Sequence, residues 1–240
     1  MDEGPEAASP PAAAPDAPLA APELVSARDT LPPAPPTSST LTVLLTHRGD
    51  AVDPGLDAAA AALAQRPDIR VVIATAGSPD AGASTMSGFP VTTVDASGSG
   101  IVVGAIEATG VRPDLVVVGI DSAPAVDGPD PIGAAAVAAD IPALVVQAEV
   151  GDVVDHAAAA MQLLEVLDLE LDALLDEPAG VHRLTVPSCR AGTLRGRVSV
   201  RARAAGETLV ASDCTTADRS EPADEVTAVR TGYAALTRLP

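Results

Sequence analysis

The sequence has almost no aromatic side chains, and it contains neither lysine nor asparagine. Phe89 and Tyr233 are its only Phe, Tyr or Trp residues, so the 240-residue chain has no platform on which nucleic-acid bases would stack. All 14 basic residues are arginine, and 33 acidic residues leave a formal net charge of −19. Because such a chain repels phosphate backbones, we expect no nucleic-acid partner.

Long apolar runs are also missing. No apolar stretch approaches the roughly 18 residues of a membrane-spanning helix, and the first four residues are acidic where a secretory signal peptide is basic. We therefore expect a cytoplasmic protein with no membrane partner. At 47% hydrophobic residues, the chain can bury a substantial core made of Ala, Val, Leu and Ile.

Cysteine is scarce as well. Cys189 and Cys214 fit neither the spacing of a zinc knuckle nor that of a redox pair. The pattern favours two buried small side chains, with a disulfide as the alternative.

Residues 1–40 have a composition unlike the rest of the chain. They hold ten of the 23 prolines, many alanines and six acidic residues against the single Arg28. Such a segment cannot bury enough apolar surface to offset the entropy lost on ordering. We predict a disordered acidic arm over 1–40 that acts as a tether, with a docking peptide within 19–31 as the alternative.

From residue 41 short β-branched runs alternate with alanine-rich stretches. This pattern predicts an α/β domain over 41–240, with a doubly wound, mostly parallel sheet and a Rossmann-like core. Expected strands lie at 41–45, 70–73, 91–94, 115–118 and 143–146, and expected helices at 56–64, 102–108, 133–139 and 153–175. A β-rich extension follows over about 183–240. It begins with a strand at 183–186, includes a hairpin of 197–203 with 207–211, and ends with a segment at 226–238.

In a doubly wound sheet, ligands bind beside the carboxyl ends of the strands, near the point where strand order reverses. The loops expected there are 46–54, 75–88 and 119–132. They are rich in ionisable side chains, namely His47, Arg48, Asp50, Asp53, Asp80, Asp121, Asp127 and Asp130. Such a cluster is either a cation site or a set of solvated loop carboxylates.

Several short motifs come in the order seen in the SurE nucleotidases, which this chain resembles over about residues 41–240. The motifs are Leu44-Leu45-Thr46, Asp53-Pro54-Gly55-Leu56, Gly82-Ala83-Ser84, the run from Arg112 to Asp121, Ile141-Pro142-Ala143-Leu144, Leu184-Thr185-Val186-Pro187 and the closing Ala228-Val229-Arg230-Thr231-Gly232-Tyr233. The resemblance implies a SurE-like fold. It also implies a metal-dependent phosphomonoesterase acting on nucleoside monophosphates.

The metal site that the resemblance implies is changed in this sequence. The family binds a divalent cation with an adjacent Asp pair, a Ser and an Asn, and these positions fall on Arg48, Gly49, Ala81 and Asp121. Of the four, Asp121 alone still has a side chain that can coordinate a cation. On the phosphate side, Ser-Gly-Thr falls on 132–134 and Gly-Pro-Asn on 123–125, so further polar groups are lost.

These changes predict a SurE-like homologue that has lost nucleotidase activity, needs no cofactor and binds a small ligand or a protein partner. The alternative is a divergent phosphomonoesterase in which Asp50 and Asp121 hold Mn²⁺ or Mg²⁺ and His47 or Arg48 lies near the phosphate. Asp80 becomes a third ligand only if its loop folds inward.

Arg48 replaces a metal ligand with a positive charge. We expect it to form an ion pair with Asp121, since a buried charge requires a partner. The alternative is that Arg48 contacts a phosphate directly. His47 is either an acid–base group or, as a single histidine in a loop, simply solvated.

The resemblance also implies a homo-oligomer, in which a segment beyond the closing motif helps to join subunits. This chain stops at Pro240. This departs from the family's way of joining subunits, and the predicted hairpin over 197–211 is one element that can still exchange between subunits, with an ordinary surface hairpin and a partner-binding edge as alternatives.

The composition of the arm leads to a test by truncation. Deleting residues 1–39 should leave the thermal midpoint unchanged within error, because the arm contributes no apolar surface to the core. Differential scanning calorimetry of the full and truncated chains checks this. A clearly lower midpoint for the truncated chain would show that the arm packs on the domain.

Overall fold

The computed structural model describes residues 40–49, 53–77, 84–122, 130–148, 154–176, 180–204, 207, 209, 211–218 and 220–239. Its strands are β1 (Leu41–Thr46), β2 (Ile69–Ala76), β3 (Thr92–Val94), β4 (Leu115–Asp121), β5 (Ala143–Ala148), β6 (Val181–Val186), β7 (Arg197–Ser199) and β8 (Ala234–Leu239). Its helices are α1 (Pro54–Leu63), α2 (Gly100–Thr109), α3 (Pro131–Ala138), α4 (His156–Leu169), α5 (Leu171–Asp176) and α6 (Glu225–Arg230).

The strands form one eight-stranded sheet in the order β3-β2-β1-β4-β5-β6-β8-β7. The first six strands run parallel, β8 runs antiparallel to β6, and β7 runs parallel to β8. The order reverses between β1 and β4, because the chain builds outward from β1 to β3 and then returns to add β4, β5 and β6. The predicted α/β doubly wound, mostly parallel sheet is confirmed.

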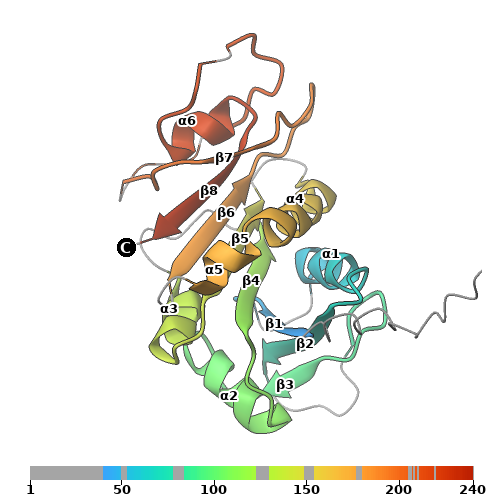
Figure 1. Ribbon diagram of the computed structural model, residues 1–240. Helices are drawn as coiled ribbons and strands as arrows, with labels where there is room; N and C mark the ends of the chain where they lie inside the picture. The colour runs from blue at the N-terminus through green and yellow to red at the C-terminus, as the bar shows by residue number, and fades with distance from the viewer. Residues whose placement is uncertain are drawn as a thin grey trace, which may run out of the picture. The chain divides into compact units, whose positions relative to one another are not determined.

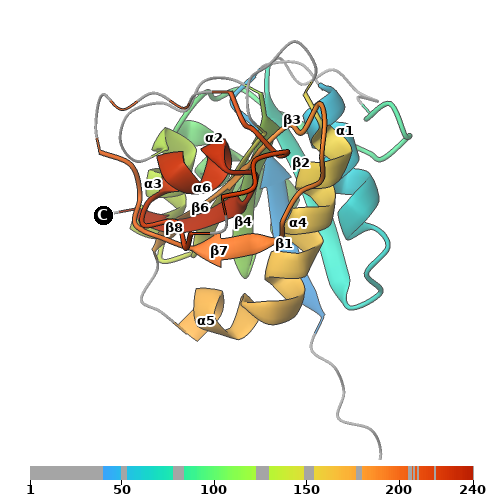
Figure 2. The same ribbon diagram turned by 90° about the horizontal axis from the view of Figure 1, so that it is seen from above.

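Helices cover both faces of this sheet, as Figures 1 and 2 show. One face carries α1 and α4, whose Leu56, Leu63 and Leu163 pack on the strands in the larger apolar cluster. The other carries α2 and α3, whose Ile101 and Ile132 belong to a second cluster. Burial from both sides explains why β4 and β5 are fully buried along their length and consist mainly of apolar residues.

Aspartate side chains begin the helices that lead away from the sheet's carboxyl edge. Asp53 accepts a hydrogen bond from the Leu56 amide at the start of α1, and Asp130 caps α3. In both helices a proline follows the cap, at a position where the missing N–H costs nothing. Each Asp-Pro pair therefore fixes a helix start close to the end of a strand.

The long helix predicted over 153–175 is two helices. The first, α4, ends at Leu169 with Glu170 as its C-cap, and the short α5 follows directly. The backbone of Glu170 has φ −123° and ψ 3°, which departs from helical geometry and separates the two segments. Residue 153 lies outside the described residues.

The C-terminal extension differs from the prediction in two ways. Residues 226–238 form most of α6 and then most of β8, because Gly232 takes a φ of 84° that ends the helix and turns the chain. The predicted hairpin is wrong in its pairing, since β7 lies parallel to β8 rather than against a following strand. Residues 207, 209 and 211, the described part of the predicted second strand, lie in no strand.

A buried carboxylate holds this extension on the sheet. Glu225, at the start of α6, is fully buried and pairs with Arg183 of β6. Its oxygens also accept hydrogen bonds from Thr185 Oγ1 at 2.7 Å and from the Arg203 amide at 3.1 Å. Because an unpaired buried charge is costly, these three donors fix α6 and residue 203 against β6.

The two cysteines form a disulfide, so the interpretation as separate buried thiols is wrong and the alternative holds. The bond joins residues 25 apart in the sequence, with the segment that contains β7 between them. Gly192 and Gly232 allow the loops to pack closely around Cys214. A Cβ added at Gly192 would lie 2.4 Å from the Cys214 carbonyl oxygen, and one added at Gly232 would lie 3.0 Å from the Cys214 Cα.

Within the described residues, no helix is both long enough and apolar enough to cross a membrane. The predicted arm over 1–40 falls, except for residue 40, outside the described residues, so its disorder stays a prediction.

The disulfide leads to a stability test. Replacing Cys189 and Cys214 together by serine should lower the free energy of unfolding by about 3 kcal/mol, because the unfolded chain then regains the freedom of a closed loop of this size. Urea unfolding of both proteins measures the difference. In addition, the wild-type protein unfolded without reductant should show no free thiol. Two titratable thiols would contradict the bond.

Candidate functional site

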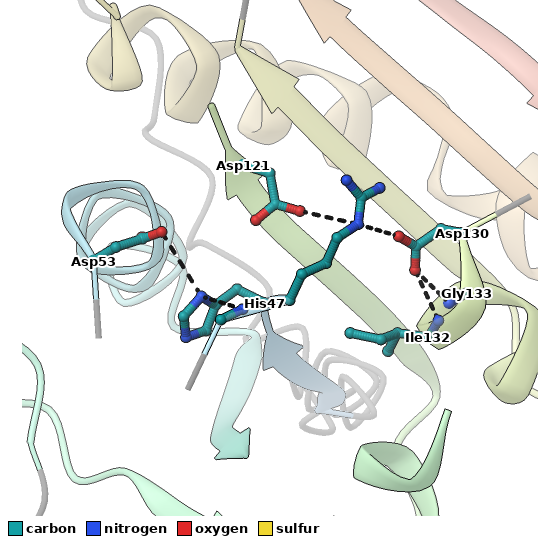
Figure 3. Close-up of polar contacts among 8 residues, drawn as sticks. His47, Asp53, Asp121, Asp130, Ile132 and Gly133 are labelled. Atoms are coloured by element: carbon teal, nitrogen blue, oxygen red, sulfur yellow. Dashed lines mark hydrogen bonds and ion pairs between the residues drawn. The ribbon is translucent and has the colours of Figure 1, made fainter. Parts of the chain in front are cut away.

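The carboxyl ends of β1 and β4 lie side by side at the point where strand order reverses. Five ionisable residues meet there, and we call them the carboxyl-edge cluster: His47, Arg48, Asp53, Asp121 and Asp130. His47 and Arg48 follow β1, Asp121 ends β4, and the other two cap α1 and α3. Figure 3 shows four of them, labelled, converging on the strand ends. The fold therefore assembles the cluster where α/β sheets bind ligands.

Arg48 pairs with two carboxylates at once. Its Nε lies 2.5 Å from Asp130 Oδ2 and 3.4 Å from Asp121 Oδ2. The arginine side chain is 20% exposed, whereas the Asp121 side chain is 8% exposed and that of Asp130 2%. The guanidinium is thus the positive charge that compensates two buried negative charges. The expected contact between Arg48 and Asp121 is present, and the shorter contact is to Asp130.

Asp130 has two roles. Its Oδ1 accepts hydrogen bonds from the amides of Ile132 and Gly133, each at 2.9 Å, and its Oδ2 accepts from Arg48 (Figure 3). One carboxylate therefore starts α3 and binds the loop after β1. This joins two parts of the chain 82 residues apart.

His47 is buried, so the expectation of a solvated loop histidine is wrong. Its side chain is 1% exposed, directly after β1 and close to Asp53, the residue that caps α1. The Gly49 amide donates to its Nδ1 at 3.3 Å, and Asp53 Oδ2 lies 3.7 Å from the same nitrogen. Since Nδ1 accepts a hydrogen bond, the proton of the neutral ring belongs on Nε2.

Burial raises the pKa of Asp121 above its ordinary value. Desolvation is the largest cause, and the negative charges of Asp130 and Asp53 act in the same direction. The positive charge of Arg48 and a contribution from His47 oppose the shift but do not cancel it. Burial therefore outweighs the nearby positive charge of Arg48 in its effect on the pKa of Asp121.

Several buried polar atoms along this edge have no hydrogen-bond partner among the described residues. They are Thr46 Oγ1, His47 Nε2, Arg48 Nη1, Asp121 Oδ2 and Gln147 Oε1. Gln147 lies on β5 in register with Asp121, so these atoms come from three adjacent strand ends. Buried polar atoms of this kind usually find partners, so their gathering at one edge makes this edge the candidate ligand site of the described residues.

The residues named from the sequence divide into two groups. His47, Arg48 and Asp121 come together as the order of strands requires. Asp50, Asp80, Ala81, Asp127 and residues 123–125 lie outside the described residues, so a role for them stays a prediction. Sequence reasoning missed Asp130 as the nearest partner of Arg48 and Asp53 as the neighbour of His47. Their signal was the repeated Asp-Pro pair, which predicts a helix cap at the sheet edge.

The residues present were compared with the needs of the divalent cation that the resemblance implies. His47, Asp53 and Asp121 each offer one ligand atom, and these atoms lie within 4.8 Å of one another. However, Arg48 contacts Asp121, and His47 Nδ1 already accepts the Gly49 amide. A cation held by Asp121 would lie next to a guanidinium and be repelled by it. The described residues do not fit a divalent cation in this arrangement.

The contacts of Arg48 lead to a double-mutant test. Arg48→Ala and Asp130→Asn should show a coupling of about 1 to 3 kcal/mol in urea unfolding, because Arg48→Ala removes the cation beside the buried Asp130 carboxylate and Asp130→Asn removes the nearer of the two carboxylates that contact Arg48. Asparagine keeps the helix cap, so the change isolates the charge. The coupling of Arg48→Ala with Asp121→Asn should be smaller, as their contact is longer. Additive losses for both pairs would contradict the ion pairs.

Comparison with known proteins supports the fold. The solved structure of the SurE protein from Aquifex aeolicus is similar to this chain, with a TM-score of 0.59 and 16% sequence identity. The match covers 82% of this chain and 92% of that chain. No family model and no curated protein matches the sequence. At this identity the likeness shows the fold alone, and this chain has a SurE-like α/β fold.

Proposed function

We propose that this chain is a SurE-like binding protein that has lost metal-dependent nucleotidase activity. The observation that carries the proposal is the position of Arg48. The resemblance assigns a metal-binding aspartate to this position, and here a guanidinium lies against the carboxylates of Asp121 and Asp130. Arginine keeps its charge at any physiological pH, so this cation is a permanent part of the chain.

An arginine at position 48, where the resemblance places an aspartate, changes what the cluster can do chemically. A phosphomonoesterase of this kind needs a metal ion to polarise the phosphate and to supply hydroxide. Gly49 offers no side-chain ligand, and Asp121 is in contact with Arg48. The remaining groups can donate, accept and orient hydrogen bonds, which is sufficient for binding a ligand.

The charge and hydrogen-bonding groups of the cluster define the ligand we propose. Asp53, Asp121 and Asp130 outnumber the single Arg48, which disfavours an anion. The unpartnered atoms include the acceptor Gln147 Oε1 and the hydroxyl Thr46 Oγ1. We therefore propose a small polar ligand that is neutral or positively charged, bound at the carboxyl-edge cluster.

One observation favours a second candidate, a divergent phosphomonoesterase. His47, Asp53 and Asp121 have the residue types and the spacing of a metal site. If Arg48 turned away from Asp121, these residues would hold Mn²⁺ or Mg²⁺, with Asp50 as a further carboxylate. The two candidates differ in metal content.

Metal analysis separates the two candidates. The purified full chain should contain no stoichiometric divalent metal and should not hydrolyse a generic phosphomonoester with added Mn²⁺ or Mg²⁺. The variant with Arg48→Asp, Gly49→Asp and Ala81→Ser should bind Mn²⁺ at least about tenfold more tightly than the wild type, as it restores three ligands and removes a repelling charge. Isothermal titration calorimetry measures the affinity.

Arg70→Asp is the matched control. It makes the same change of charge as Arg48→Asp, at an exposed position on β2, and should leave Mn²⁺ affinity unchanged. One tightly bound metal ion per wild-type chain, together with phosphatase activity lost on Asp121→Asn, would replace the proposal with the second candidate.

A further inference from the structure

Gln147 is a buried glutamine whose amide oxygen has no hydrogen-bond partner. It lies near the carboxyl end of β5 and is 2% exposed, and its Oε1 is unpartnered among the described residues. The other residues of β5 are alanine, leucine and valine. A buried amide oxygen without a partner costs free energy, because water no longer bonds to it. A bound ligand is the partner that would complete this group.

Gln147 adjoins the carboxyl-edge cluster through Asp121. The two residues are in register on neighbouring parallel strands, so their side chains point to the same face of the sheet. Asp121 lies 3.4 Å from Arg48 Nε, and it offers an oxygen within 4.8 Å of a ring nitrogen of His47. Figure 3 shows His47 and Asp121 at the neighbouring ends of β1 and β4. Polar groups from three adjacent strand ends therefore lie close together.

The unpartnered atoms of these residues include two donors and two acceptors. His47 Nε2 carries the ring proton, because Nδ1 already accepts a hydrogen bond, and Arg48 Nη1 is a guanidinium nitrogen. Both atoms donate only. Asp121 Oδ2 and Gln147 Oε1 are carboxylate and amide oxygens, which accept. The fifth atom, Thr46 Oγ1, belongs to a hydroxyl and can do either.

The ion pair with Arg48 leaves the hydrogen-bonding capacity of Asp121 Oδ2 unused. Arg48 Nε has a single hydrogen, which it donates to Asp130 Oδ2 at 2.5 Å. The 3.4 Å contact with Asp121 is therefore an ion pair without a hydrogen bond. The charge of Asp121 has a partner, whereas its oxygen can still accept a hydrogen bond from a ligand.

Solvent reaches this group of residues on the side of the loop after β1. The side chain of Arg48 is 20% exposed and that of Asp53 is 40% exposed, whereas His47 and Gln147 are buried. A small molecule that enters beside Arg48 would meet groups that water does not satisfy. Hydrogen bonds to such groups compete less with water than those on an open surface.

The pattern of donors and acceptors decides between ligand classes. A metal ion or an ammonium group would face the donors of His47 and Arg48, and an anion would face the acceptors of Asp121 and Gln147. Each would leave two buried groups without a partner, which is costly. A hydroxyl group offers one donor. A primary amide has two N–H donors and a carbonyl oxygen with two lone pairs, so its count matches the site.

We propose that the carboxyl edge binds the primary carboxamide group of a neutral ligand. The ligand's NH₂ group donates to Asp121 Oδ2 and Gln147 Oε1. Its carbonyl oxygen accepts from His47 Nε2 and Arg48 Nη1. The inference rests on the proposed function, because a metal ion bound to Asp121 would take the place of the ligand. Gln147 is then the residue that selects an amide.

Acetamide, acetate and acetamidinium are the probes, because they share one skeleton and differ only in donors, acceptors and charge. The chain has three glutamines and no asparagine, so the side-chain amides of ¹⁵N-labelled protein give few NMR signals. At neutral pH with EDTA, acetamide should shift the Gln147 side-chain signals saturably. The signals of Gln65 and Gln162, which donate to Ala61 and Glu165, should not move.

The other probes should bind acetamide's site poorly. Acetate and acetamidinium should each bind at least about tenfold more weakly than acetamide, since each leaves buried groups unpaired. Glycerol, a neutral molecule with hydroxyl groups in place of the amide, should also bind more weakly. This comparison uses the wild-type chain and does not depend on how any variant folds.

Gln147→Leu should weaken acetamide binding about tenfold or more, because it removes one acceptor. The backbone amide of Gly49, which donates to His47 Nδ1, reports binding in this variant. Gln162→Leu is the matched control. Gln162 is also a buried glutamine with an unpartnered Oε1, on α4, and its replacement should change acetamide affinity by no more than about twofold.

Several results would overturn the inference. They are the absence of a saturable Gln147 shift with acetamide, binding of acetate, acetamidinium or glycerol as tight as that of acetamide, unchanged affinity in Gln147→Leu, and an equal loss in Gln162→Leu. In metal-free protein, any of them rejects the amide ligand and leaves the proposed loss of nucleotidase activity intact. Stoichiometric metal with phosphatase activity in the wild type would instead overturn the proposed function and this inference with it.

Discussion

The parallel pairing of β1 with β4 is the constraint on which the rest of the domain depends. Residues far apart in the sequence become neighbours there, and the chain builds outward from this pair in both directions. Both strands are buried between two layers of helices, so their polar groups come at the ends. The loops that leave them carry the carboxyl-edge cluster. The position of the cluster thus follows from the strand order, and its chemistry follows from the residues placed in those loops.

The chemistry of the cluster is decided by which cation compensates its carboxylates. Asp121 and Asp130 are largely buried, and buried carboxylates require a positive charge nearby. A metal ion meets this need reversibly and brings reactivity. Arg48 supplies the positive charge permanently and does not supply a metal ion's reactivity. Its contact with Asp130 also ties the loop after β1 to the start of α3. Under the function proposed above, one substitution accounts both for the loss of catalysis and for the gain of a structural ion pair.

The sequence was informative where periodicity and strand order determine structure. Alternating apolar runs predicted the first five strands within a few residues, and the Arg48–Asp121 contact followed from their expected proximity. Prediction failed where a single residue overrides a pattern. Gly232 divides what looked like one segment into α6 and β8, and β7 pairs with an open edge that lies distant in sequence. Two cysteines 25 residues apart gave no sign of their proximity, which only the folded loops create. Disulfides persist mainly in oxidising compartments, so the cytoplasmic location stays a prediction that this bond does not favour.

The aspartate caps of α1 and α3 have a consequence for anions at the carboxyl edge. The amino end of a helix carries partial positive charge and free amides, which in many α/β proteins receive a ligand's phosphate. Here Asp53 takes the Leu56 amide, and Asp130 takes those of Ile132 and Gly133. The chain thus supplies its own tethered anions to both helix ends, at an effective concentration that a freely diffusing competitor would have to exceed. Because Asp53 and Asp130 already bind these amides, the two helix ends hold loops in place. They are not free to bind a negatively charged ligand, which would have to bind at another part of the molecule.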